Sequence, residues 1–279
     1  MLKTRIITAI VLIIGFTAAL FKASDMAWAF ITLAATLIAV WEWSNLIKLT
    51  KPQMYLSVAS ALSVGLMLMF ASKSSVETPL GYYMDELVFI LLCVSAVFWM
   101  VLAPVWLISR KKISQKFILA LLGLSLLLAL WVALNGLHKI NPWLLLGVLA
   151  TVWLADSTAY FAGKSFGRHK LAPEISPGKT WEGVAGAMLA VTFYGLLLCN
   201  YLHYSHWLIV GLWLIVVLSV MGDLFESLLK RQAGVKDSSQ LLPGHGGVLD
   251  RIDGLIPTLP LVLFYIYFPL FSNLQLHVR

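Results

Sequence analysis

Residues 117–135 read FILALLGLSLLLALWVALN, nineteen positions without a single charge. A helix of about 20 apolar residues crosses the roughly 30 Å hydrocarbon core of a bilayer. Eight further runs have similar character, and they cover 6–21, 27–47, 54–71, 87–108, 143–162, 181–199, 207–222 and 255–271. The pattern predicts an all-α polytopic membrane protein with about nine transmembrane helices.

Composition favours the same fold class. Of the 279 residues, 60% are hydrophobic and 12% are charged, whereas about a quarter are charged in soluble domains. Lipid must therefore cover most of the surface, and we predict a single integral membrane domain over 1–279. Within it, we expect 1–140 to form a scaffold and 141–279 to supply the catalytic helices and loops.

Basic residues indicate how the chain is oriented. If the nine runs are spans, sixteen of the twenty Lys and Arg residues fall in alternate loops on the side of the N-terminus. The positive-inside rule then places the N-terminus and two long functional loops, 163–180 and 223–253, in the cytoplasm. Residues 1–24 also fit a cleaved signal peptide, and cleavage would leave this sidedness unchanged. The net charge of +7 lies in short loops, which favours lipid head groups or phosphorylated substrates over nucleic acid.

The stretch after 207–222 holds the densest group of polar side chains. Four of them share one face if the helix continues: Asp223, Glu226, Ser227 and Lys230. Asp250 and Asp253 are also three positions apart, at the mouth of the last run. Carboxylates from two helix ends can converge on a hard cation such as Mg²⁺. Unpaired carboxylates at a helix mouth are costly, so simple membrane anchoring does not explain them.

A glycine-rich turn, Pro243-Gly244-His245-Gly246-Gly247, lies between these carboxylates. Glycine permits close approach of the backbone, and exposed N–H groups in such a turn can bind phosphate. Basic side chains flank the turn: Lys230, Arg231, Lys236 and Arg251. The combination indicates a site for a nucleotide polyphosphate.

The second polar loop ends in Gly178-Lys179-Thr180, which imitates the end of a Walker A loop. The match fails because Pro173 stands where the first glycine must be and no strand is expected before it. What remains is a basic turn with Lys179 at the start of a helix, where the dipole and the lysine both favour phosphate.

Two carboxylates lie inside apolar runs. Insertion of a carboxylate such as Asp156 into a membrane helix costs roughly 2.5–3.5 kcal/mol, so we expect it to face a polar cavity or a partner. Glu42, between Trp41 and Trp43, has no motif around it. A functional and a structural role for Glu42 are equally compatible with the sequence.

The stretch Ser227-x-x-Lys230-Arg231 through Asp250-Arg251-x-Asp253 resembles the signature of the phosphatidate cytidylyltransferases. The segment from Asp156 to Gly183 is similar to another stretch typical of bacterial members. The resemblance implies an inner-membrane enzyme of phospholipid biosynthesis. Such an enzyme transfers the cytidylyl group of CTP to phosphatidic acid and releases CDP-diacylglycerol and pyrophosphate. It also implies Mg²⁺ as cofactor, with a second cation left open, and often a homodimer.

The resemblance also implies roles for particular residues. Those expected to be catalytic are Asp223, Lys230, Arg231 and Asp250. Those expected to bind substrate are Asp156, Ser176, Lys179, Ser227, Lys236, His245, Gly246, Gly247 and Arg251. Those expected to bind the metal are Asp223, Asp250 and Asp253.

Two other functions fit less well. A transporter would explain an intramembrane Asp156, but the polar residues gather on one side rather than at the midplane, and no inverted repeat is visible. A CDP-alcohol phosphotransferase would carry an Asp-Gly-x-x-Ala-Arg segment, which does not occur in the sequence.

Overall fold

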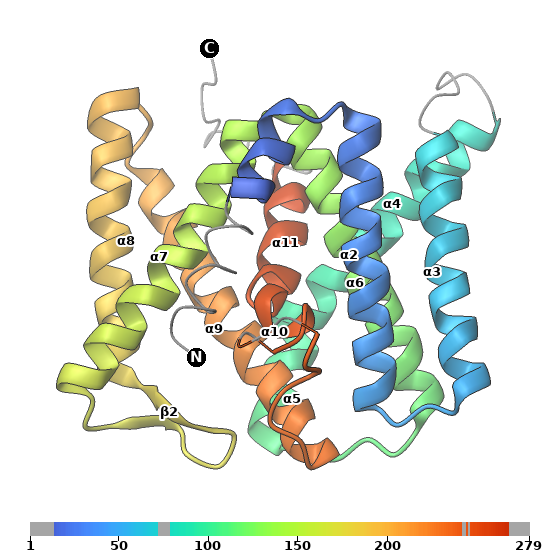
Figure 1. The fold of residues 1–279 in the computed structure, drawn as a ribbon. Helices are drawn as coiled ribbons and strands as arrows, with labels where there is room; N and C mark the ends of the chain where they lie inside the picture. Colours follow the sequence, from blue (N-terminus) through green and yellow to red (C-terminus); the bar gives the residue numbers. More distant parts are fainter. Residues whose placement is uncertain (1–13, 72–78, 242–243, 245, 268–279) are drawn as a thin grey trace.

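Helices dominate the computed structural model, which describes residues 14–71, 79–241, 244 and 246–267 (Figure 1). Residues 14–22 form a helical segment ahead of the first labelled helix. In chain order the labelled elements are α2 (Asp25–Leu46), α3 (Lys51–Ala71), α4 (Pro79–Val97), η1 (Phe98–Leu102), α5 (Ala103–Ser109), α6 (Lys116–Ile140), α7 (Pro142–Phe166), β1 (Lys170–Ala172), β2 (Ser176–Thr180), α8 (Trp181–Leu202), α9 (Trp207–Ala233), α10 (Leu249–Ile252) and α11 (Leu255–Tyr267).

Among the described residues, seven helical segments are long and apolar enough to cross a membrane. They are Asp25–Leu46, Lys51–Phe70, Tyr83–Ser109, Lys116–Ile140, Pro142–Phe166, Trp181–Leu202 and Trp207–Ala233. Half of the first apolar run, 6–13, lies outside the described residues, and the last run is described only as α11, as far as Tyr267. The chain is therefore an all-α polytopic membrane protein, while the count of nine spans stays a prediction.

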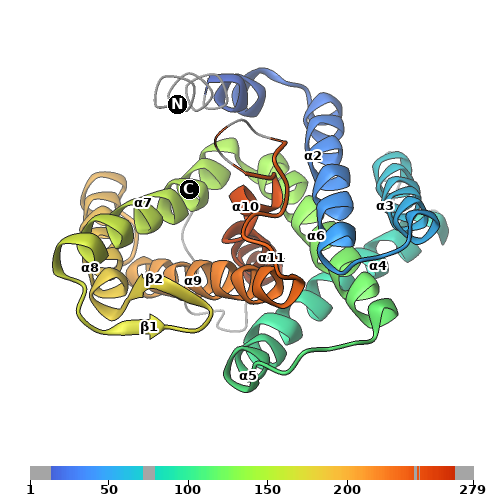
Figure 2. The same ribbon diagram turned by 60° about the horizontal axis from the view of Figure 1, so that its bottom comes forward.

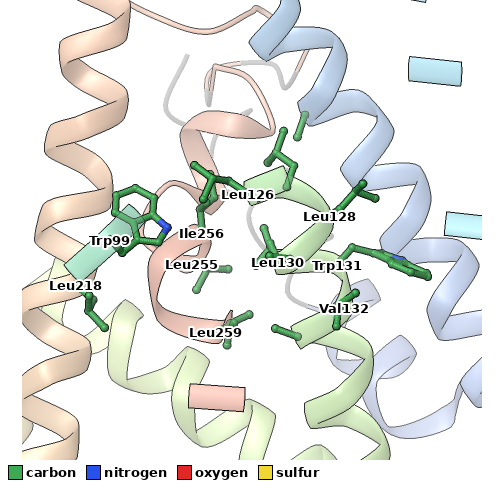
Figure 3. Packing of buried hydrophobic residues seen from close by; sticks show 14 of the residues in the cluster. Trp99, Leu126, Leu128, Leu130, Trp131, Val132, Leu218, Leu255, Ile256 and Leu259 are labelled. Atoms are coloured by element: carbon green, nitrogen blue, oxygen red, sulfur yellow. The ribbon is translucent and has the colours of Figure 1, made fainter. Parts of the chain in front are cut away.

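Helix α6 lies at the centre of the bundle and packs against α2, α4, α7 and α11. Every residue from 126 to 133 is buried, as expected for a helix that is apolar on all sides. Figure 3 shows Leu126 and Leu130 of α6 beside Ile256 and Leu259 of α11. This packing fixes α11, and with it the short helix α10 that precedes it.

The rotation of α9 is fixed by an aromatic contact. Phe225 is 2% exposed and packs edge-on against Phe98, Trp99 and Trp106, with ring centroids 5.2–5.5 Å apart. Edge-to-face pairs of this kind are favourable beyond the area they bury. With Phe225 held in this pocket, the polar side chains at 223, 226 and 230 must point to another side of α9.

A two-stranded hairpin occupies part of the stretch that the sequence suggested was an irregular loop. Helix α7 continues to Phe166, and β1 pairs antiparallel with β2, with Lys170 opposite Thr180. The expectation that no strand precedes this segment is therefore wrong, because β1 ends at Ala172, directly before Pro173, and β2 itself contains Lys179. Pairing between the two strands determines this structure, and the sequence of short polar segments carries little signal for such pairing. The hairpin is not the buried parallel strand of a P-loop domain, and Pro173 still excludes that motif.

Several basic loops meet at one end of the bundle, the lower end in Figure 1. Arg110 forms an ion pair with Glu174 of the hairpin, and Gln232 at the end of α9 donates to the Arg110 carbonyl over 3.4 Å. Figure 2 shows the hairpin beside α9 from this end. The loops predicted to share one side of the membrane thus lie together.

Candidate active site

Helix α9 extends beyond the apolar run and forms the platform of the site. The predicted helical face is confirmed by two contacts within it. Ser227 donates to Asp223 over 3.2 Å, and the Lys230 ammonium lies 2.5 Å from Glu226. The helix ends at Ala233 and is capped by Gly234, whose φ of 80° is a left-handed conformation that glycine adopts without strain. All four side chains are therefore carried by one rigid element.

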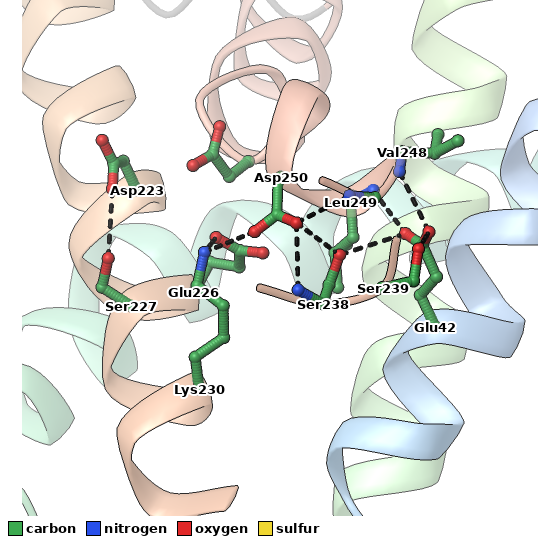
Figure 4. Close-up of polar contacts among 12 residues, drawn as sticks. Glu42, Asp223, Glu226, Ser227, Lys230, Ser238, Ser239, Val248, Leu249 and Asp250 are labelled. Atoms are coloured by element: carbon green, nitrogen blue, oxygen red, sulfur yellow. Dashed lines mark hydrogen bonds and ion pairs between the residues drawn. The ribbon is translucent and has the colours of Figure 1, made fainter. Parts of the chain in front are cut away.

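Four residues from α9, α10 and the loop between them form what we call the inner cluster: Glu226, Lys230, Ser238 and Asp250. The Lys230 ammonium lies 2.5 Å from a carboxylate oxygen of both Glu226 and Asp250, as Figure 4 shows. The side chains of Lys230, Glu226 and Asp250 are 13%, 3% and 5% exposed. A buried cation between two carboxylates is costly to disturb, because removal of one partner leaves another charge uncompensated.

Asp250 uses both of its oxygens within the protein. Oδ1 contacts Lys230, while Oδ2 accepts hydrogen bonds from Ser238 N–H at 2.9 Å, Ser238 Oγ at 2.8 Å and Gly247 N–H at 2.8 Å. Burial opposes ionisation of Asp250, but the hydrogen bonds from Lys230, Gly247 and Ser238 outweigh it and lower its pKa to about 2. Asp250 is therefore a fixed anion that holds Lys230 and the incoming loop.

Glu42 reaches this loop from α2, although the sequence gave it no clear role. Its carboxylate accepts hydrogen bonds from Ser239 Oγ at 2.6 Å and from the N–H groups of Val248 and Leu249 at 3.0 and 2.6 Å. Its side chain is fully buried. The only sequence signal was an acidic residue inside an apolar run, which is unusual unless the residue has a partner.

Gly247 of the glycine-rich turn lies close to Ser238 and Glu42. A Cβ at this position would clash with Ser238 Oγ and lie 2.5 Å from Glu42 Oε1. Glycine is thus required here for close approach of the backbone. Gly246 beside it has a φ of 79°, and His245 lies outside the described residues. The turn packs on protein groups, so phosphate binding by it stays a prediction.

A second group, which we call the outer cluster, consists of Asp156, Lys179, Asp223 and Asp253. Lys179 of β2 lies 2.6 Å from Asp223, with side chains 23% and 39% exposed. Burial first, and the neighbouring charge of Asp223 second, raise the pKa of Asp253 to about 7, while Lys179 opposes the rise. Asp156 is a further electrostatic neighbour of Asp253, and it accepts a hydrogen bond from Ser219 over 3.4 Å. The expectation that Asp156 meets polar partners is confirmed.

Gly222 allows the outer cluster to assemble. A Cβ at this position would clash with the Asp253 carbonyl and lie 2.9 Å from the Pro257 ring. Because glycine has no side chain, α9 can approach the junction between α10 and α11 closely. Asp223, the next residue along α9, is thereby brought beside Asp253.

The carboxylates of the two clusters supply the oxygen atoms that a hard cation prefers, but their present arrangement is not that of a metal site. Oxygen atoms are the ligands that Mg²⁺ prefers, and Glu226 Oε1 is buried without a hydrogen-bond partner. Within the described part of the chain, however, no three His, Cys, Asp or Glu side chains are grouped as a metal site. Asp223 and Asp253 are neighbours, whereas Asp250 points at Lys230 and Ser238. The metal set Asp223, Asp250 and Asp253 stays a prediction.

The other predicted site residues are distributed around these clusters. Arg231 donates to the Ile175 carbonyl over 3.4 Å, which ties α9 to the hairpin. Lys236 and Arg251 are exposed, and among the described residues their side chains form no hydrogen bond or ion pair. Ser176 lies in β2, three residues from Lys179. The sequence did not single out Ser219, Ser238 or Ser239, because serines in loops and helices carry no distinctive pattern.

Comparison with known proteins adds to this geometry. Residues 3–269 match the cytidylyltransferase family. A Haemophilus influenzae protein named phosphatidate cytidylyltransferase is 38% identical, and the match covers 97% of this chain and 100% of that protein. A Pseudomonas aeruginosa protein of the same name is 36% identical, with 93% and 95% covered. A third, from Brucella abortus, is 45% identical over 45% of this chain and 47% of that protein. Because the match spans nearly the whole sequence, the chain belongs to the cytidylyltransferase family.

Proposed function

We propose that this chain is a membrane-embedded nucleotidyltransferase that transfers the cytidylyl group of CTP to phosphatidic acid. The products are CDP-diacylglycerol and pyrophosphate, and the reaction belongs to phospholipid biosynthesis. The observation that carries the proposal is the pairing of Lys179 with Asp223 beside the buried Lys230 cluster. Basic side chains and carboxylates from separate segments gather at the end of a spanning helix. The chain also belongs to a family of cytidylyltransferases.

The reaction requires little acid–base chemistry from the protein. A phosphate oxygen of phosphatidic acid attacks the α-phosphorus of CTP, the new P–O bond forms, and the bond to the β-phosphate breaks. Pyrophosphate leaves with the electron pair of that bond. Because the attacking phosphate is already ionised near neutral pH, catalysis consists mainly of positioning and of neutralising charge on the phosphates.

The two lysines contribute to this task in different ways. Lys230 is held by two buried carboxylates, so it supplies a fixed positive charge at the floor of the site. Lys179 is paired with one partly exposed carboxylate and can exchange that partner for a phosphate oxygen. We assign contacts with the outer phosphates to Arg251 and Lys236, which are exposed, and Arg231 holds the hairpin in position.

Mg²⁺ is the cofactor that the carboxylates of the site suit. Asp223 and Asp253 would hold it, and Asp250 completes the proposed set, although both of its oxygens now contact Lys230, Ser238 and Gly247. When bound, the ion neutralises charge on the phosphates and orients the leaving pyrophosphate. Lys179 already lies at Asp223, so metal binding and phosphate binding by Lys179 would occur at the same place. A second cation stays open.

Membrane sidedness supports access to both substrates. The basic loops gather at one end of the bundle, and the positive-inside rule assigns that end to the cytoplasm, where CTP is found. We place the protein in the bacterial inner membrane, with the N-terminus on the cytoplasmic side. The lipid substrate reaches the site sideways from the bilayer, because extraction costs about 0.8 kcal/mol per CH₂. A homodimer stays a prediction from the resemblance.

Formation of labelled CDP-diacylglycerol tests the function directly. Purified protein in mixed micelles of detergent and phosphatidate is given labelled CTP, with and without Mg²⁺. We expect a lipid-soluble labelled product that requires both phosphatidate and metal. A well-folded protein that binds CTP without making this product, from several phosphatidate species, would contradict the proposal and favour a transporter.

A further inference from the structure

The carboxylate of Glu42 forms its hydrogen bonds with the candidate site rather than with its own helix. It lies on α2, in the half of the chain that the sequence suggested was scaffold, yet its partners are in the segment 238–249. Figure 4 shows its carboxylate facing Ser238, Ser239, Val248 and Leu249. We propose that Glu42 is a positioning residue, which holds α10 so that Asp250 meets Lys230. The inference rests on the proposed function, since it concerns the same site.

The carboxylate of Glu42 acts as a cap for α10. That helix begins at Leu249, with Val248 as its N-cap residue, and the Val248 side chain has no capping hydrogen bond. The N–H groups of Val248 and Leu249 instead donate to Glu42 Oε1 and Oε2. The first amides of a helix have no partner within it, so an acceptor must come from elsewhere. Here it comes from a helix about two hundred residues earlier in the chain.

Ser238 connects Glu42 to Asp250. Its hydroxyl lies 2.8 Å from Asp250 Oδ2 and 3.4 Å from Glu42 Oε2. A hydroxyl has one hydrogen to donate, so the shorter contact with Asp250 is the principal one. Glu42 fixes the neighbouring Ser239 Oγ at 2.6 Å, which places Ser238 against Asp250. Both flanks of Asp250 are thus held by the same buried carboxylate.

The chemistry of these contacts requires a carboxylate rather than an amide. Every group that faces Glu42 is a donor, and an ionised carboxylate is purely an acceptor with two oxygens. In Glu42→Gln, one oxygen becomes an NH₂ group and faces donors, while the volume hardly changes. The hydrogen bond from one α10 amide would be lost without opening a cavity, which makes this substitution a sharp test of positioning.

The experiment compares Glu42→Gln with Ser44→Ala in purified full-length protein. Ser44 is also buried on α2, but it donates to the Val40 carbonyl of its own helix. The first readout is hydrogen exchange of the amides in 246–252 without substrate, followed by mass spectrometry. We expect faster exchange there in Glu42→Gln, by about tenfold for a loss near 1.4 kcal/mol, and no change in Ser44→Ala.

The second readout is the Mg²⁺ concentration for half-maximal product formation. Loss of a residue that orients a ligand typically costs about 10- to 100-fold in metal affinity or activity, so we expect a shift of about tenfold in Glu42→Gln. A variant that matches Ser44→Ala in either readout would overturn the inference. If the wild-type protein makes no product, the proposed function fails while exchange in 246–252 still decides the positioning role.

If Glu42→Gln does not fold, Ser239→Ala gives the decision. It removes the 2.6 Å hydrogen bond to Glu42 Oε1 and so loosens the carboxylate that caps both α10 amides. We expect a smaller change, about three- to fivefold in both readouts, as for one hydrogen bond of about 1 kcal/mol. Exchange and Mg²⁺ dependence equal to those of the wild type would overturn the proposal.

Discussion

The inner and outer clusters use the same residue types in opposite ways. In the inner cluster, Lys230 and its two carboxylates are between 3% and 13% exposed, and each oxygen of Asp250 has a protein donor. In the outer cluster, Lys179 and Asp223 are 23% and 39% exposed and form one ion pair. One group is closed by the protein, and the other is open to ligands.

The difference indicates a division of labour. Charges that are fully paired and buried keep their geometry because every alternative is costly. An exposed pair contributes little to stability, commonly between 0 and about 1 kcal/mol, so its members can exchange partners at low cost. We expect the inner cluster to set the shape of the site and the outer cluster to bind metal and phosphate.

The largest effect should follow from Lys230→Met, which would break the inner cluster. It leaves Glu226 and Asp250 buried without their cation, and such a loss typically costs about 3–5 kcal/mol. We expect a clearly lower melting temperature together with loss of product formation. Lys116→Met is the matched control, since Lys116 is exposed and its ammonium donates a hydrogen bond to the Lys48 carbonyl. A stable Lys230→Met protein with normal turnover would remove the distinction between the clusters.

Asp223→Asn should be the sharpest test of the outer cluster. The side chain is 39% exposed, so we expect the melting temperature to stay within a few degrees. Turnover should fall about 10²- to 10³-fold, as when a preorganised electrostatic group is removed from an active site. Glu174→Gln, which removes another exposed and paired carboxylate, should retain activity. Near-normal turnover in both Asp223→Asn and Asp250→Asn would contradict the metal assignment.

Lys179→Gln should raise the KM for CTP. A hydrogen bond from a charged group is worth about 1.5–3 kcal/mol, which corresponds to a change of roughly 10- to 100-fold. Lys179→Arg should recover part of this loss because it keeps the charge. Lys170→Gln on the neighbouring strand β1 is the control, and steady-state kinetics with varied CTP is the measurement. An unchanged KM would place CTP away from the hairpin.

Ser227→Ala should have the smallest effect. The hydroxyl donates one 3.2 Å hydrogen bond to Asp223, and a neutral donor of this kind contributes about 0.5–1.5 kcal/mol. We expect a two- to tenfold rise in the Mg²⁺ requirement, with folding unchanged. Ser125→Ala, which removes a hydroxyl bonded within α6, should change neither quantity. A loss as large as that of Asp223→Asn would mean that Ser227 contacts substrate itself.

Much of this organisation could be predicted from the sequence. Apolar runs of bilayer length predict spanning helices, and the described part of the chain contains seven helices that are long and apolar enough to span. The helical face of Asp223, Ser227 and Lys230 was also predictable, because i, i+4 and i+7 spacing is a local property. The hairpin of β1 and β2 was not, since pairing between short polar segments leaves no periodic signal.

Long-range contacts decided the rest of the site. Glu42 and Leu249 are separated by 207 positions, and no pattern along the chain connects them. The same holds for Lys179 and Asp223, whose pairing depends on how the hairpin packs on α9. The residue types and the membrane architecture were determined by the sequence itself, because hydrophobicity and spacing act locally. Which charge is buried, and which carboxylate stays open to a ligand, was decided only when the helices packed together.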